Sequence, residues 1–254
     1  MLRTGSRDGL TARSRVSGHR FITVALLSLA ALLVFTACGS TTTTSGGSNN
    51  GGSGLPGAKP TAQQILANAQ KANVKDVTFT MEVETNSSEG ANIKMTGNGK
   101  ATMRPTRMAM TLNLGEEGME EVAVIEAVVD ETTNSFYSRF TKPEILAKGW
   151  SKTTNEEFKD SLPGVQTQVT PPYSKLTNVT LVGEDTVNGA KVWHVKGTIP
   201  AAGDTPSADM DIYVHQSGNL PAKMVTHLTD DSTAIATIVY TGVNTGVTVD
   251  IPKV

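Results

Sequence analysis

Alternation of apolar and polar residues dominates the chain from residue 77 onward. Phe79, Met81 and Val83 alternate with polar residues in the first stretch, and comparable stretches follow as far as residue 251. This period of two is typical of β-strands that bury one face. Because turn residues separate the stretches, the pattern predicts about ten antiparallel strands. The last two are expected over 234–240 and 247–251.

The clearest turn signal is the pair Asn188-Gly189. Both residues tolerate the positive φ that a type I′ hairpin turn requires. In the strand that follows, Trp193 and Val195 are expected on one face and His194 on the other.

Three segments favour a helix. Residues 61–73 carry Thr61 and Gln64 in capping-box spacing, ahead of an apolar stripe with a helical period. Residues 154–161 begin with the same spacing, and residues 142–148 suit one or two helical turns. The chain therefore predicts two or three helices beside its strands.

These elements indicate an α+β fold that is mainly β. A continuous antiparallel sheet of about ten strands curls, because long twisted sheets rarely stay open. Its apolar side needs cover, for which the helix at 61–73 and the segment 142–162 are available. Because that cover is small, we expect an incomplete half-barrel. Two or three helices would cover its concave apolar side and fill the interior only in part.

The apolar strand faces are expected to converge on the concave side as a ligand cavity. Eight methionines follow residue 38, most of them at such positions, and flexible Met suits apolar surfaces that accept varied partners. An ordinary Met-rich core explains the same composition equally well. The candidate cavity residues are Phe79, Met81, Val83, Ile93, Met95, Met108, Met110, Leu112, Leu114, Met210, Ile212 and Val214.

The N-terminus has the features of a bacterial lipoprotein signal. Five arginines precede an apolar run over 21–37, and the tetrapeptide Phe35-Thr36-Ala37-Cys38 resembles a lipobox, with Phe35 where Leu is usual. We expect residues 1–37 to be removed and Cys38, the only cysteine, to carry lipid. An uncleaved membrane anchor is the alternative, since 17 apolar residues are at the lower limit for a span. Either way the rest of the chain lies on the outer, extracytoplasmic face of the cell membrane.

Two further regions follow the signal. Residues 38–59 are rich in Gly, Ser and Thr and predict a flexible tether. Residues 60–254 are long enough for one domain with its own core. Residues 1–37 contain five of the 22 basic and one of the 24 acidic residues, so the remaining 217 carry a formal charge of −6. That charge argues against nucleic acid as a partner.

No motif for catalysis, metal or cofactor binding stands out. His194, His215 and His227 fall on predicted strands without a ligand spacing, and we expect them to face solvent. Asp209 and Asp211 share a strand face that we expect to be solvated. We therefore predict no enzyme, no metal and no cofactor.

Several stretches resemble the LppX/LprG group of bacterial lipoproteins within the LolA-like superfamily. They are AQQILANAQKA with VKDVTFTMEVE, and later LVGEDTVNGAKVWHVKGTI with MDIYVHQSGNLPAKMVTH. The likeness spans roughly residues 60–252. It implies an incomplete antiparallel barrel closed by helices, with an apolar cavity that binds or carries lipids or acyl chains, and no catalytic residues. The alternative function is an envelope sensor module of LolA-like fold that binds another envelope protein.

The lipidation site provides the first test. Radiolabelled fatty acid should enter the wild-type chain and not the Cys38→Ser variant, because the thiol is the acyl acceptor. Labelling is measured in membranes of cells expressing each form. Equal labelling of the two forms would rule Cys38 out as the lipidated residue.

Overall fold

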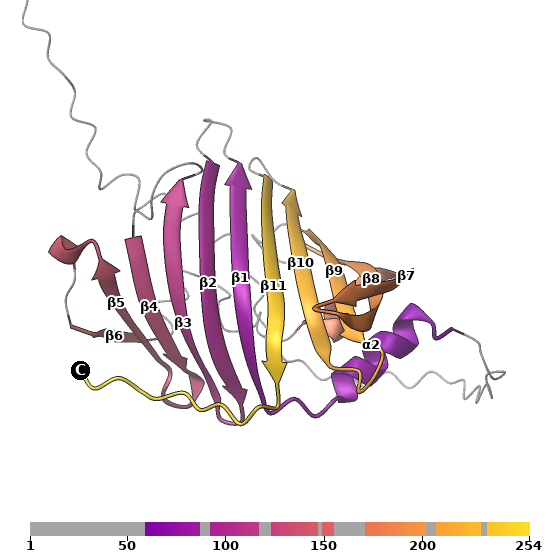
Figure 1. Ribbon diagram of the computed structural model, residues 1–254, viewed down its shortest axis with the longest axis horizontal. Helices are drawn as coiled ribbons and strands as arrows, with labels where there is room; N and C mark the ends of the chain where they lie inside the picture. The colour runs from indigo at the N-terminus through magenta and orange to yellow at the C-terminus, as the bar shows by residue number, and fades with distance from the viewer. Residues whose placement is uncertain are drawn as a thin grey trace, which may run out of the picture.

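The chain folds around one antiparallel sheet of 11 strands (Figure 1). The computed structural model describes residues 59–86, 92–116, 123–146, 149–154, 171–201, 207–229 and 233–254. The first half of the sheet contains β1 (Asp76–Asn86), β2 (Asn92–Met103), β3 (Thr106–Glu116), β4 (Ala123–Asp130), β5 (Ser135–Lys142) and β6 (Ser151–Thr154). The second half contains β7 (Thr177–Val187), β8 (Ala190–Ile199), β9 (Ala208–His215), β10 (Pro221–Thr229) and β11 (Thr233–Val243).

The strand order is β6-β5-β4-β3-β2-β1-β11-β10-β9-β8-β7. The sheet thus consists of two meanders, and the first strand of one pairs with the last strand of the other. The sheet is not closed, since β6 and β7 form its two edges. These findings confirm the prediction of a mainly β fold built on an incompletely closed antiparallel sheet.

One α-helix lies within the described part of the chain, α2 (Ala62–Lys71). Its predicted capping box is present: the Gln64 backbone N–H donates to Thr61 Oγ1 at 3.2 Å, and the Thr61 N–H donates to Gln64 Oε1 at 2.9 Å. Ile65, Leu66 and Ala69 form its buried stripe. The structure also has short 3₁₀ turns, η1 (Glu131–Thr133), η2 (Glu144–Leu146) and η4 (Tyr173–Lys175).

The prediction of two or three covering helices is not confirmed. The predicted helix at 154–161 begins at a residue that belongs to β6, and its remainder lies outside the described residues. In the segment 142–148, Lys142 belongs to β5, and the one helical element among the described residues is the single turn η2. Within the described residues, no helix is long and apolar enough to cross a membrane.

The predicted hairpin between β7 and β8 is confirmed. Asn188 has φ of 50° and Gly189 has φ of 79°, so both central residues adopt the left-handed backbone of a type I′ turn. The two strands then pair antiparallel from Val187 and Ala190 outward.

The predicted strand at 247–251 is wrong. After β11 the chain runs along one end of the sheet, across the strands, as Figure 1 shows, so its backbone cannot extend the ladder. The turn is held by the buried carboxylate of Asp76, which accepts the Thr245 N–H at 2.8 Å and the Gly246 N–H at 3.1 Å. Val249 then packs on Val128 and Tyr137. The apolar alternation of residues 247–251 therefore reflects burial of side chains in a C-terminal tail and not strand pairing.

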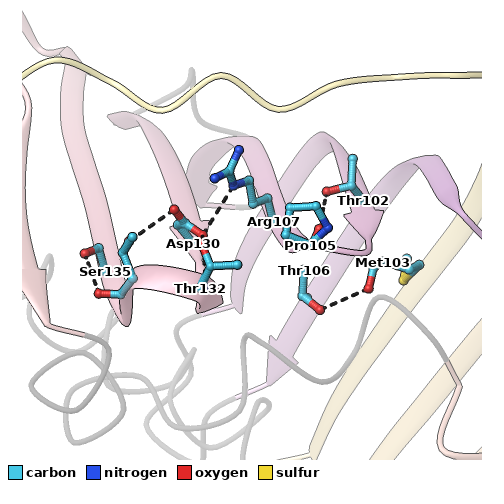
Figure 2. Close-up of polar contacts among 9 residues, drawn as sticks. Thr102, Met103, Pro105, Thr106, Arg107, Asp130, Thr132 and Ser135 are labelled. Atoms are coloured by element: carbon cyan, nitrogen blue, oxygen red, sulfur yellow. Dashed lines mark hydrogen bonds and ion pairs between the residues drawn. The ribbon is translucent and has the colours of Figure 1, made fainter.

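A second buried carboxylate, Asp130, connects β3 to the turn between β4 and β5 (Figure 2). Its side chain is 2% exposed and accepts the Thr132 N–H at 3.0 Å, the Thr133 hydroxyl at 3.1 Å and Arg107 Nε at 3.3 Å. Burial alone would raise the pKa of Asp130, but the hydrogen bonds from Thr132, Thr133 and Arg107 outweigh it and lower the pKa.

We expect Asp130→Ala to lower the free energy of unfolding by about 2 kcal/mol at neutral pH, because it removes a cap and a charged hydrogen-bond acceptor. Urea denaturation measures this. The folded-state pKa is lowered, so the stabilisation is present above the unfolded pKa and is lost as the pH falls through the folded value. The difference in unfolding free energy between variant and wild type should therefore shrink below about pH 4.

The control is Glu131→Ala. Glu131 is the exposed residue next to Asp130, so its removal should change stability little. A similar loss in both variants would contradict the role of Asp130.

Candidate functional site: the apolar inner face of the sheet

Strand register brings the apolar positions of neighbouring strands opposite one another. Met81 pairs with Ile238 on β11 and with Gly97 on β2. Met224 on β10 pairs with Ile212 on β9, which pairs with Val195 on β8. Because directly paired residues point to the same side of a sheet, these positions form one continuous apolar surface. We call it the inner face, and the opposite side the outer face.

The structure gathers the predicted cavity residues on this inner face. Ten of them are buried members of a single cluster, and Met81 is partly buried against it. Ile93 lies in β2, but its side chain is outside the described residues. The ten are Phe79, Val83, Met95, Met108, Met110, Leu112, Leu114, Met210, Ile212 and Val214.

Further residues of the inner face were not among the sequence candidates. Ile125 and Val129 on β4 pair with Leu112 and Met108, and Tyr240 on β11 pairs with Phe79. The apolar run of β4 is nearly continuous, so its periodicity alone does not distinguish its two faces. On β11, which pairs with β1, the alternation of Ala234, Ala236, Ile238 and Tyr240 was a usable signal.

Two tyrosine hydroxyls are buried at this cluster. The hydroxyl oxygens of Tyr173 and Tyr240 have no hydrogen-bond partner in the part of the chain that the structure describes. Tyr240 belongs to the buried cluster and Tyr173 packs against it from η4. Burial raises the pKa of both tyrosines, so each keeps its O–H proton at neutral pH. The apolar face thus contains two neutral donors.

Helix α2 packs on one end of the inner face. Its buried residues Ile65, Leu66 and Ala69 belong to the same cluster as the strand residues. Among the described elements it contacts chiefly η4 and β7. The helix therefore lies toward the β7 edge, while the methionines and leucines of β2 and β3 lie on the other half of the sheet.

The sequence predicts that Asp211 and the histidines of the neighbouring strands face solvent. This prediction is wrong for Asp211, which lies at the centre of a group with His194 and His227. Asp211 is 9% exposed, and its carboxylate oxygens lie 2.5 Å from His194 Nε2 and 3.1 Å from His227 Nε2. Burial by itself would raise the pKa of Asp211, but the His194 hydrogen bond and the Lys196 charge lower it. The sequence alone did not predict this contact because it depends on strand register. Strand β9 lies between β8 and β10, and this order brings His194 and His227 to the Asp211 carboxylate.

The prediction of solvent exposure holds for Asp209 but not for His215. Asp209 is exposed and accepts a hydrogen bond from the Thr198 hydroxyl at 2.9 Å. His215 is half-buried, which lowers its pKa. Among the described residues, no group of three or more His, Cys, Asp or Glu side chains is arranged to hold a metal ion.

Comparisons with known proteins identify the fold. No protein-family model and no curated protein matches the chain. Among solved structures, LprF from Mycobacterium bovis matches with a TM-score of 0.51 and 15% identity, over 75% of this chain and 96% of LprF. The lipoprotein LppX from Mycobacterium tuberculosis matches with a TM-score of 0.48 and 18% identity, over 73% of this chain and 98% of LppX.

A LolA superfamily protein from Nitrosomonas europaea matches more distantly, with a TM-score of 0.29 and 10% identity, over 76% of this chain and 96% of that protein. At such identities a structural likeness shows the fold alone. The assignment of the fold rests on the LprF match. The resemblance predicted from the residues is therefore confirmed at the level of the fold: the chain has a fold like that of the lipoprotein-group member LprF.

Proposed function

We propose that this protein is an extracytoplasmic lipoprotein, anchored to the membrane through Cys38, that binds lipids or acyl chains against the inner face of its sheet. The observation that carries the proposal is the continuous apolar inner face of a sheet that is not closed. An open sheet leaves a route between its edges and this face, which a closed barrel does not.

The composition of the inner face suits acyl chains. Its half over β2 and β3 is made of the flexible side chains Met95, Met108, Met110, Leu112 and Leu114. Methionine adapts its shape to a guest, because its side chain is unbranched and polarisable. Burial of each methylene of an acyl chain contributes about 0.8 kcal/mol, so a chain of ordinary length has ample driving force.

The buried hydroxyls of Tyr173 and Tyr240 support a ligand that also has polar atoms. A buried hydroxyl without a partner is unfavourable by about 1–3 kcal/mol. An ester carbonyl or a headgroup oxygen of a lipid would accept hydrogen bonds from these donors. A pure hydrocarbon would leave them unpaired.

The test compares one substitution on each face of β3. Each variant is made in the Cys38→Ser background, which lacks the anchor and therefore the anchor's own acyl chains. The parent chain should co-purify with lipid that mass spectrometry detects. Met110→Arg should lose most of that lipid, because it places an unpaired charge on the inner face. Asn113→Arg, on the outer face of the same strand, should retain it.

Circular dichroism and thermal melting separate lost binding from lost folding. If Met110→Arg unfolds, the milder Met110→Gln variant replaces it in the same comparison. A parent chain that purifies without any apolar molecule, together with unfolding of both Met110 variants, would show that the inner face is a packed core. The protein would then be better explained as an envelope module that binds another protein.

A further inference from the structure

A hollow of about 480 Å³ lies on the outer face of the sheet, across from the apolar site. Its floor is formed by side chains that project from β1 to β4, and Thr241 of β11 and Trp150 border it. Phe79 and Met110 also border it, but their side chains belong to the inner face, so they contribute main-chain atoms, as does Gly99, which has no side chain. The volume falls within the range of small-molecule sites.

The floor of the hollow carries several polar groups set among apolar side chains such as Ala109 and Val128. It carries the hydroxyls of Thr78, Thr80 and Thr111, the amide of Asn98 and the ammonium group of Lys100. Thr78 Oγ1 already accepts a hydrogen bond from Thr241 Oγ1 at 2.9 Å. In the part of the chain that the structure describes, the side chains of Thr80, Asn98, Lys100 and Thr111 have no hydrogen-bond or ionic partner. Four polar groups are thus available to a ligand.

The charges of the hollow leave one cation unpaired. Glu126 is the acidic residue of the lining. Its carboxylate oxygen Oε2 lies 2.5 Å from Arg139 Nε, and this ion pair neutralises its charge. Lys94 lies on the same face of β2 as Lys100 but is paired with Glu82 and with Glu84 at 3.2 Å. Lys100 therefore remains available to an anionic group, and the hollow favours a ligand with at least one negative charge.

Trp150 supplies an aromatic wall. The Arg139 guanidinium covers its ring at 4.8 Å from the centroid, and the indole also packs on the cluster of Val128 and Val249. These contacts fix the ring at the border of the hollow. A ring held in this way offers apolar surface to the C–H groups of a ligand at little entropic cost.

We propose that this hollow binds a linear acidic saccharide. Its carboxylate pairs with Lys100, its hydroxyls pair with Thr80, Asn98 and Thr111, and a sugar ring contacts Trp150. The floor extends from β11 to β4, four strand spacings or roughly 19 Å, which suits a chain of several sugar rings. This inference does not depend on lipid binding at the inner face.

Other ligand classes fit the hollow less well. An acyl chain would leave the floor hydroxyls without partners. A peptide that adds a strand needs an open sheet edge, and the hollow lies over central strands whose backbone is paired. Nucleic acid needs several cations in a row, whereas this floor has one.

The two tryptophans allow a direct test, because Trp150 is at the hollow and Trp193 belongs to the inner-face cluster. In the full-length Trp193→Phe variant, all tryptophan fluorescence comes from Trp150. Titration with a glucuronate-containing hyaluronan tetrasaccharide should change that fluorescence saturably. Neutral chitotetraose should bind at least about tenfold more weakly, since it lacks the carboxylate.

Matched variants in the same background locate the site. Lys100→Met should weaken hyaluronan tetrasaccharide binding about tenfold or more and should abolish the preference over chitotetraose. Lys94→Met, on the same face of the same strand, should leave both unchanged. Thr111→Val should weaken both saccharides, while Thr237→Val, outside the hollow, should weaken neither.

Three results would overturn the proposal. The first is the absence of any fluorescence change with either saccharide at millimolar concentration. The second is equal binding of the neutral and acidic probes by the chain with Lys100 intact. The third is equal weakening by Lys94→Met and Lys100→Met. None of them bears on the lipid content measured for Met110→Arg, so the two proposals fail independently.

Discussion

The pairing of β1 with β11 is the interaction on which the rest of the structure depends. It joins the two meanders across most of the sequence, with Phe79 opposite Tyr240 and Met81 opposite Ile238. Without it, each half would be a separate sheet with an additional open edge, at β1 in one half and at β11 in the other. Contacts this distant in sequence are entropically expensive to form, so the junction needs local support.

That support is concentrated where β1 begins and β11 ends. The Asn244 side chain accepts the Lys75 N–H at 2.6 Å and donates to the Asn73 carbonyl at 2.9 Å. Burial would raise the pKa of Asp76, but the N–H groups of Thr245 and Gly246 outweigh it and lower the pKa, so the carboxylate stays charged in its nest of donors. The same contacts direct the tail along one end of the sheet toward Val128. One junction thus fixes both the pairing of the two meanders and the course of the tail.

The alternation of residues 77–84 was sufficient to predict β1, and the spacing of Thr61 and Gln64 was sufficient to predict the start of α2. Both signals are local, and in both cases the element depends mainly on its own residues. The features that sequence reasoning missed depend on contacts between residues that are distant in sequence. Asp211 meets His194 and His227 only because β9 lies between β8 and β10. Residues 247–251 alternate like a strand, but the Asp76 contacts turn them away from the ladder.

An open sheet gives a ligand access to its inner face and also leaves two edges that other chains can extend. The edges here are poor templates for such pairing. β6 is only four residues long, is exposed and carries Lys152 over the Tyr137 ring. β7 is longer, but register shifts between Thr177 and Thr180 and between Leu181 and Gly183 interrupt its regular course. A sheet of this kind can therefore remain open, because one edge strand is short and the other is irregular. At its centre, the missing side chain of Gly99 lets the Phe79 ring approach β2 closely.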